Sequence, residues 1–325
     1  MNKQRAMLDI LTQCIEEKIL PGASISFINR NNDNCFYLGQ VGVLPPFNVS
    51  VNQGLIYDLA SLTKVVGTTT RILQLIEEKK LTLGSKVSNI IDNFVFKEIS
   101  IENLLLHNSG LIGDFIDKKG INKNNILSKI NQTELSFNPL TTYSDLGFIL
   151  LGLVIEQIDN CDLQTSFYEN IFKKLSMTST SYLAQETKEN YVPTEIKKDR
   201  GIIQGVVNDT KCYLLDGISG HAGLFSSLSD LNKFIRSLLF DEILIKNETK
   251  KLMLSFNVND RRLGWESTYG ERTIFHTGFT GTSIGLDFNN EVAYIVLANR
   301  NFPERNSSYL PHQRKLAEVF FNKSN

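Results

Sequence analysis

The strand-forming patterns of this 325-residue chain lie at its two ends, and helix-forming patterns fill the middle. Near the N-terminus, residues 23–29 and 35–38 flank the turn-rich residues 30–34, an arrangement typical of a β-hairpin. A third short strand is expected over residues 54–58. Three more strand patterns follow near the C-terminus, over residues 272–276, 283–288 and 292–298. We expect both sets to join one antiparallel sheet, with the helical middle as an insertion.

This organisation predicts an α/β (α+β) protein whose antiparallel sheet is flanked by N- and C-terminal helices. Residues 1–80 and 225–325 would form the α/β domain, and residues 81–224 a mainly helical inserted domain. The active site would lie in the cleft between the two parts. Ser229 is a candidate N-cap for the helix that follows it. The clearest helical patterns cover residues 7–15, 61–80, 101–107, 146–158, 230–240 and 311–321.

The composition excludes several classes of protein. The net charge of -1 argues against a nucleic-acid-binding protein, which usually carries an excess of basic residues. The four cysteines form no CxxC motif, and the four histidines form no HExxH motif. We therefore expect neither a metal nor another cofactor, and we expect a small molecule or a peptide as substrate. The oligomeric state is left open.

The N-terminal segment does not resemble a signal peptide, because charged residues such as Arg5, Asp9 and Glu16 interrupt its apolar positions. No apolar run approaches the roughly 20 residues that a membrane-spanning helix needs. The sequence therefore predicts a cytoplasmic protein without a membrane span.

Ser61 and Lys64 form a Ser-x-x-Lys pattern at the start of a helical segment. A serine hydroxyl needs a base within hydrogen-bond reach before it acts as a nucleophile. Residues i and i+3 of a helix lie on one face, so Lys64 is expected beside Ser61. A buried Lys64 with a lowered pKa would be neutral and would serve as the base. The same pattern also arises by chance on solvated helices.

A second motif, Tyr143-Ser144-Asp145, stands directly before the apolar helix pattern of residues 146–158. Tyr143 as a phenolate would exchange protons with Lys64. Asp145 would accept hydrogen bonds from Lys64 or from a substrate amide. In the alternative interpretation, Ser144 or Asp145 only caps the helix and Tyr143 only packs.

A third motif, His276-Thr277-Gly278-Phe279, lies on an expected edge strand. Glycine lets the backbone approach a ligand closely. An edge strand offers free N–H groups to an oxyanion or to an extended substrate. The alternative interpretation is a glycine-rich turn in which His276 is a structural histidine.

In this order the three motifs resemble the signature of the serine β-lactamase and penicillin-binding-protein superfamily. The similarity is to its class C-like branch, with DD-peptidase-like and esterase-like relatives. Residues 104–111 and 220–226 are also similar to loops of that branch. The resemblance covers residues 21–299 and implies the β-lactamase/DD-peptidase-like fold.

The resemblance implies a hydrolase in which Ser61 is acylated and water then attacks the acyl-enzyme. Lys64 and Tyr143 would share the role of base, and their titrations would be coupled. The backbone N–H groups of Ser61 and Phe279 would form the oxyanion hole. The implied substrate-binding residues are Asp145, His276, Thr277, Gly278, His221 and Ala222, of which the last two would line the cleft wall.

Two positions depart from the family pattern. Asp145 replaces an asparagine, and His276 replaces a lysine that would bind a substrate carboxylate. Histidine is only partly charged near pH 7, and the charge of Asp145 would repel an anionic substrate. Both changes weaken the interpretation as a true β-lactamase. We therefore expect a DD-peptidase-like hydrolase of D-amino-acid peptides or amides. The alternatives are a carboxylesterase, a weak β-lactamase and a non-catalytic binding protein.

Overall fold

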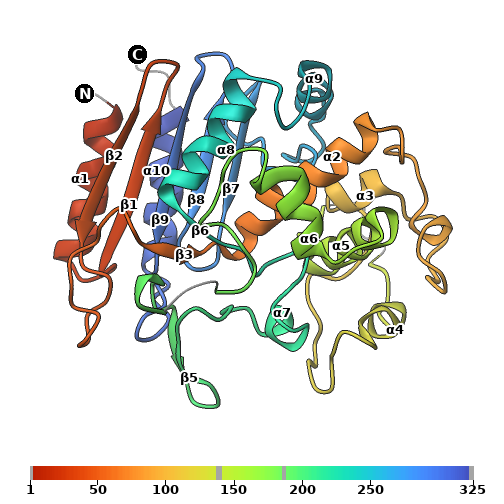
Figure 1. Cartoon of the computed structure of the whole chain (residues 1–325), viewed down its shortest axis with the longest axis horizontal. Coiled ribbons are helices and arrows are strands. Elements are labelled where there is room, and N and C mark those ends of the chain that lie inside the picture. The colour runs from red at the N-terminus through yellow and green to blue at the C-terminus, as the bar shows by residue number, and fades with distance from the viewer. Residues whose placement is uncertain (1–2, 137–140, 185–187, 322–325) are drawn as a thin grey trace.

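A single five-stranded antiparallel sheet forms the centre of the protein, in the order β2-β1-β9-β8-β7 (Figure 1). The computed structural model describes residues 3–136, 141–184 and 188–321. The prediction that both ends of the chain share one sheet is confirmed, because β1 pairs with β9 and places Ile25 opposite Val296. The strands are β1 (Gly22–Ile28), β2 (Asp33–Gly39), β7 (Thr273–Thr277), β8 (Ser283–Asp287) and β9 (Val292–Ala298).

Both faces of this sheet are covered by helices. Helices α1 (Lys3–Glu16) and α10 (Tyr309–Phe321) pack together on one face, and α8 (Leu228–Phe240) lies on the other (Figure 1). Successive residues of β9 alternate between the two cores: Tyr294 packs with α1 and α10, and Ile295 belongs to the larger core on the α8 side. Period-2 alternation therefore places apolar side chains on both faces.

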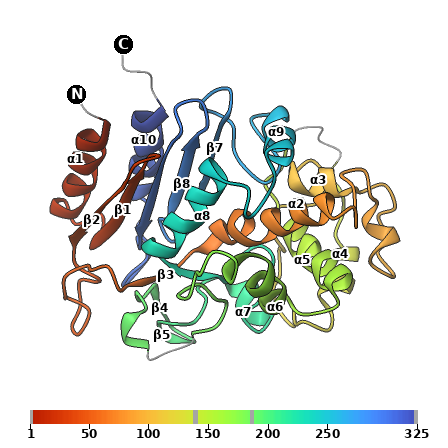
Figure 2. The ribbon, with the colours of Figure 1, turned by 45° about the horizontal axis from the view of Figure 1, so that its top comes forward.

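The remaining helices come mostly from the middle of the chain and lie beside the sheet (Figure 2). They are α2 (Thr70–Glu77), α3 (Ile101–Leu105), α4 (Ile126–Asn131), α5 (Asp145–Asp159), α6 (Leu163–Phe167), α7 (Thr210–Leu214) and α9 (Asn247–Ser255). Short 3-10 and π segments complete them: Ala60–Leu62, Val87–Asn89 and Lys188–Asn190 are 3-10, and Lys64–Thr69 and Tyr168–Phe172 are π.

Two small antiparallel pairs connect these parts. Strand β3 (Ile56–Asp58), which we expected in the main sheet, instead forms a separate pair with β6 (Phe225–Ser227), directly before the Ser-x-x-Lys pattern. Strand β4 (Glu195–Lys197) pairs with β5 (Gly201–Ile203). The domain boundaries at residues 80 and 225 stay a prediction.

Helix caps correct one expectation and confirm part of another. Ser227, not Ser229, caps α8, and its side chain accepts a hydrogen bond from the backbone of Asp230. The helix therefore begins two residues earlier than the sequence pattern indicated. Ser144 caps α5 through the backbone N–H of Gly147, as the capping interpretation expected. Within the described ranges, no helix is both long and apolar enough to cross a bilayer.

Candidate active site

Ser61 lies where β3 turns into the long helical segment that ends with α2. The preceding residue, Ala60, has a positive φ of 47°, which L-residues rarely adopt. Its N–H donates to Oδ1 of Asp58 at 2.8 Å, and Oδ2 of Asp58 accepts from the backbone of Asn208 at 2.8 Å. Burial raises the pKa of Asp58 to about 6. A buried carboxyl group therefore fixes the turn that aims Ser61.

The His-Thr-Gly motif lies directly against this turn. The Thr282 hydroxyl donates to the Leu59 carbonyl at 3.2 Å, and the Thr280 hydroxyl donates to the Asp58 carbonyl at 2.9 Å. A Cβ on Gly278 would lie 2.0 Å from Oγ1 of Thr282 and 2.7 Å from the Leu59 carbonyl oxygen. Only glycine fits this approach without displacing the strand.

The nucleophile and the expected base are in contact. Nζ of Lys64 lies 3.0 Å from Oγ of Ser61, 3.0 Å from the carbonyl oxygen of His221 and 2.8 Å from Oδ1 of Asp145. The side chain of Lys64 is fully buried. Residue Lys64 begins the π segment, and such irregular turns are frequent at functional sites. The i and i+3 prediction is therefore met in a segment that is not a regular α-helix.

Tyr143 completes the expected trio. Nζ of Lys64 lies 5.0 Å from the centroid of the Tyr143 ring, and the guanidinium carbon of Arg261 lies 5.4 Å from it. On the inner side the ring packs against the imidazole of His107, with the centroids 4.6 Å apart. The Tyr143 side chain is partly exposed and lines the cavity in front of Ser61.

The expected lowering of the Lys64 pKa is wrong. Burial alone would lower this pKa, but the Asp145 carboxylate and the Tyr143 phenol outweigh burial, and the pKa is raised. Desolvation alone is not decisive for Lys64, because the charge of Asp145 lies in contact with it. Lys64 therefore rests as an ammonium and would have to lose a proton before it could accept one from Ser61.

Asp145 contacts a second buried lysine that the motifs did not identify. Its Oδ2 lies 3.1 Å from Nζ of Lys211, which also lies 3.2 Å from Asp114 and 3.4 Å from Asp209. Despite burial, the neighbouring cations, Lys64 first, hold the pKa of Asp145 well below its ordinary range. Asp145 is therefore ionised, and Lys64 and Lys211 balance its negative charge. The predicted repulsion of anionic substrates by Asp145 loses its basis.

His221 and Ala222 do not line the cavity as expected. Both are buried behind it. The His221 ring bridges the Ser219 hydroxyl at 2.8 Å and the Asp209 carboxylate at 2.9 Å. Its carbonyl oxygen holds Lys64, so this loop supports the site from behind. Asp145, Asp209 and His221 bring three potential ligand atoms within 4.8 Å of one another, but ammonium groups already contact both carboxylates.

His276 is buried and neutral, which corrects the expectation of a partly charged imidazole. Its Nδ1 donates to the Thr277 carbonyl at 2.8 Å. Nε2 is buried with no hydrogen-bond partner among the described residues. Burial, and after it the cations Lys64 and Arg261, lower the pKa of His276 to about 3. An imidazolium that binds a substrate carboxylate near pH 7 does not fit this environment.

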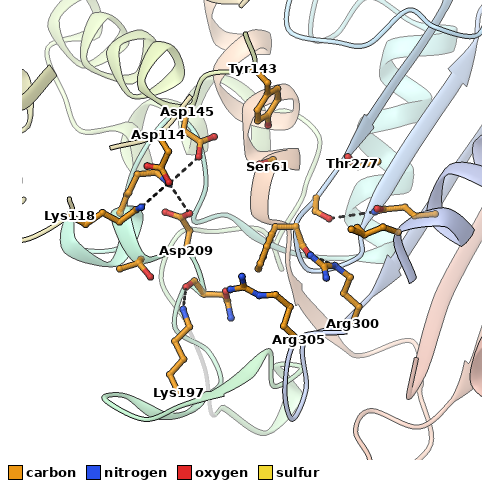
Figure 3. Close-up of a pocket in the computed structure, with 17 residues that line it drawn as sticks. Ser61, Asp114, Lys118, Tyr143, Asp145, Lys197, Asp209, Thr277, Arg300 and Arg305 are labelled. Carbon is orange, nitrogen blue, oxygen red and sulfur yellow. Dashed lines mark hydrogen bonds and ion pairs between the residues drawn. The ribbon is translucent and has the colours of Figure 1, made fainter. Parts of the chain in front are cut away.

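A cavity of about 630 Å³ opens in front of Ser61 (Figure 3). Thr277, Gly278 and Phe279 line it together with Ser61, so the two expected oxyanion donors face the same space. One side is lined by Lys118, Lys211, Asp114, Asp145 and Asp209, and the buried Lys64 contacts Asp145 behind it. We call these six residues the charge-paired wall.

Another part of the lining carries an excess of positive charge. This cationic wall consists of Lys197, Arg300 and Arg305 (Figure 3). The guanidinium carbons of Arg300 and Arg305 lie 4.8 and 4.5 Å from the centroid of the partly exposed Phe279 ring. Glu195 is the one carboxylate within 4 Å of these cations in the described part of the chain, at 3.6 Å from Lys197 and 3.9 Å from Arg305. Sequence reasoning missed this wall, because its residues belong to no motif.

Burial and neighbouring cations lower the pKa values of two residues in this wall. Burial first, and then Arg200, lower the pKa of Lys197. Burial first, and then Arg305, lower the pKa of Arg300. Nε of Arg300 already donates to the Phe279 carbonyl at 2.9 Å, whereas the Arg305 side chain is half exposed. Arg305 is therefore the cation best placed to meet an anion in the cavity.

A family model described as Beta-lactamase matches residues 9–318 of the chain. A curated protein of Escherichia coli O157:H7, named "Putative D-alanyl-D-alanine carboxypeptidase", is 28% identical to it over 318 residues. This match covers 81% of the present chain and 73% of that protein.

Solved structures are similar in fold at lower identity. A class C β-lactamase from Rhodobacter sphaeroides superposes with a TM-score of 0.79 at 16% identity, covering 98% of this chain and 100% of that one. The structure titled "EstCE1, a hydrolase with promiscuous acyltransferase activity" superposes with a TM-score of 0.76 at 17% identity and covers 98% of each chain.

Proposed function

Because this chain belongs to the Beta-lactamase family and has the β-lactamase/DD-peptidase fold, we propose that it hydrolyses its substrate through an acyl-enzyme on Ser61. The observation that carries the proposal is the contact of 3.0 Å between Nζ of Lys64 and Oγ of Ser61 at the cavity. A serine paired with a buried lysine has the arrangement of an activated nucleophile.

In the first step, Oγ of Ser61 attacks the substrate carbonyl carbon, and its proton passes to the pair formed by Lys64 and Tyr143. The backbone N–H groups of Ser61 and Phe279 bind the oxyanion. The bond to the leaving group then breaks, and the leaving group takes the proton from the pair. Water attacks the acyl-enzyme in the second step, breaks the ester bond and returns a proton to Ser61.

For the substrate, the cationic wall supports a peptide or amide that carries a carboxylate, as a D-amino-acid peptide does. Arginine binds carboxylates through paired N–H donors, and Arg305 is half exposed in the cavity. The charge-paired wall adds no net repulsion, because three carboxylates face three ammonium groups there. The E. coli relative is named as a D-alanyl-D-alanine carboxypeptidase, which supports a substrate of this class.

An ester hydrolase is the second candidate, and the apolar part of the cavity lining favours it. The cavity of about 630 Å³ is lined in part by the exposed apolar side chains of Phe279 and Leu310, which would contact an apolar acyl or alcohol group. The similar structure titled as a hydrolase with acyltransferase activity shows that the fold also hosts acyl transfer.

The experiment is intact-protein mass spectrometry during incubation with benzylpenicillin, for the wild type and Ser61→Ala. A mass increase of one whole penicillin on the wild type alone would support the acyl-enzyme and a penicillin-binding, DD-peptidase-like site. An equal increase on Ser61→Ala would overturn the assignment of the nucleophile.

If no adduct forms and the penicillin is not consumed, small neutral esters and a fluorophosphonate become the next probes. Turnover of the esters with labelling of Ser61 would support the ester hydrolase. A wild type that neither probe labels would refute the proposed acyl-enzyme.

A further inference from the structure

Lys211 is a buried cation outside the catalytic trio. It lies in the short helix α7, and its side chain is 3% exposed. Its Nζ lies within 3.4 Å of three carboxylates, those of Asp145, Asp114 and Asp209. An ammonium group has three N–H donors, so these contacts account for all of them. Every hydrogen-bonding position of this group is thus committed to the charge-paired wall.

Asp145 links this lysine to the nucleophile. Its Oδ1 lies 2.8 Å from Nζ of Lys64, and its Oδ2 lies 3.1 Å from Nζ of Lys211. Lys64 also has three acceptors, namely Asp145, the His221 carbonyl and Oγ of Ser61. A Lys64 ammonium donates to all three. Once one proton is lost, its lone pair faces the Ser61 hydroxyl.

We propose that Lys211 is a positioning residue that holds one oxygen of Asp145 toward each lysine and sets how readily the Lys64 and Tyr143 pair releases a proton. The positive charge of Lys211 offsets three carboxylates. Without it, their negative charge would stabilise protonated Lys64, because opposite charges favour the charged form. The inference rests on the acyl-enzyme function proposed for Ser61.

Other titratable groups surround these two lysines and also influence the protonation of Lys64. Asp145 at the start of α5 and Tyr143 two residues before it face Lys64, and the neutral His276 faces it from β7. The remaining contacts lie further out: Arg261 over the Tyr143 ring, Lys118 at 2.9 Å from Asp114, and His221 at 2.9 Å from Asp209. Among the described residues, Lys211 is the cation that contacts all three carboxylates.

The test is the pH dependence of Ser61 labelling by a neutral fluorophosphonate. In Lys211→Met the acid limb of the rate should move up by about one pH unit, so the rate on the limb falls about tenfold. In Asp114→Asn, which removes one carboxylate, the limb should move down. Lys211→Arg should retain most of the wild-type profile. The control is Lys173→Met, which removes an exposed lysine paired with Glu169 at 2.7 Å.

Opposite shifts of the acid limb in Lys211→Met and Asp114→Asn would support the inference. The loss of a merely structural contact would not move the limb in opposite directions in the two variants. An unmoved limb in folded Lys211→Met, or equal shifts in both variants, would overturn it. If Lys211→Met fails to fold, Asp114→Asn still decides, because the Asp114 side chain is 42% exposed. An unmoved limb in Asp114→Asn would then count against the proposal.

Failure of the proposed function would look different. In that case the wild type itself would not be labelled at Ser61. An NMR titration of lysines labelled with ¹³C at Cε, with Lys64 assigned through Lys64→Arg, would still report the pKa of Lys64. An unchanged Lys64 titration in Lys211→Met would refute the role of Lys211 without any use of activity.

Discussion

The two walls of the cavity treat charge in opposite ways. In the charge-paired wall, buried ammonium groups and carboxylates lie within about 3 Å of one another, as for Lys64 and Asp145 at 2.8 Å. In the cationic wall, Lys197 and Arg305 share Glu195 at 3.6 and 3.9 Å, no such carboxylate contact is found for Arg300 among the described residues, and Arg305 is half exposed. Paired buried charges suit proton transfer at a fixed geometry, whereas surplus exposed charge suits recognition of a ligand. We therefore expect the charge-paired wall to serve proton transfer and the cationic wall to serve substrate recognition.

The largest effect should follow from breaking the charge-paired wall at Lys64. Lys64→Met removes the group in contact with Ser61, so Ser61 labelling by a fluorophosphonate should fall by roughly 10² to 10⁴. The exposed pair of Lys173 with Glu169 supplies the control, Lys173→Met, which should react normally. Wild-type labelling of a folded Lys64→Met variant would show that another group is the base.

A smaller loss is expected at Gly278, beside the proposed oxyanion hole. In Gly278→Ala the new methyl group would lie 2.7 Å from the Leu59 carbonyl oxygen and would displace the loop that carries Phe279. Loss of one oxyanion donor typically costs about 10² to 10³ in kcat, which steady-state kinetics would measure. Gly84→Ala is the matched control, because its nearest neighbour is 4.0 Å away. A normal kcat in Gly278→Ala would separate Phe279 from the oxyanion hole.

Recognition by the cationic wall should change more modestly. For matched substrates with a free or an amidated carboxylate, Arg305→Gln should reduce the preference for the free acid about tenfold, since a hydrogen bond to a charged group contributes about 1.5 kcal/mol. Turnover of the neutral substrate should stay close to wild type. Arg314→Gln, on the exposed side of α10, is the control. An unchanged preference would remove Arg305 from substrate recognition.

The smallest effect concerns His276. Its pKa of about 3 keeps it neutral from pH 5 to pH 8, so KM for a carboxylate substrate should change less than about twofold through His276 in that range. An inflection near pH 6 to 7 that disappears in His276→Gln would contradict this. Stability has a defined sign, because the lowered pKa contributes stability that is complete above the unfolded value of about 6.5 and is lost as pH falls toward 3.

The sequence was sufficient where neighbours in the chain are neighbours in space. The spacing of Ser61 and Lys64 and the hairpins were predictable from local patterns. The joining of both chain ends in one sheet is a long-range contact, and it was predictable because strand patterns occur at both ends of the chain. The family match confirms the assigned superfamily. The roles assigned to individual residues, such as Tyr143 and Phe279, stay predictions that the geometry supports.

What the sequence could not provide depends on distant partners and on burial. Lys211 meets Asp145 from 66 positions away, and no spacing rule connects them. Arg305 enters the cavity from the C-terminal part of the chain without a motif. The charge state of His276 depends on burial and on Lys64, which a motif does not record. The expectations that the structure corrects at the site therefore concern charge states, such as those of Lys64 and His276.

The backbone conformation of Ala60 affects the thermostability of the protein. Its left-handed backbone costs an L-residue about 1 to 2 kcal/mol, whereas glycine adopts it freely. Selection for heat resistance alone should therefore favour glycine beside Ser61. An alanine at this turn instead restricts the backbone directly before the nucleophile more than a glycine would. Directed evolution toward higher melting temperature should find Ala60 early, and the variants it yields should turn over more slowly.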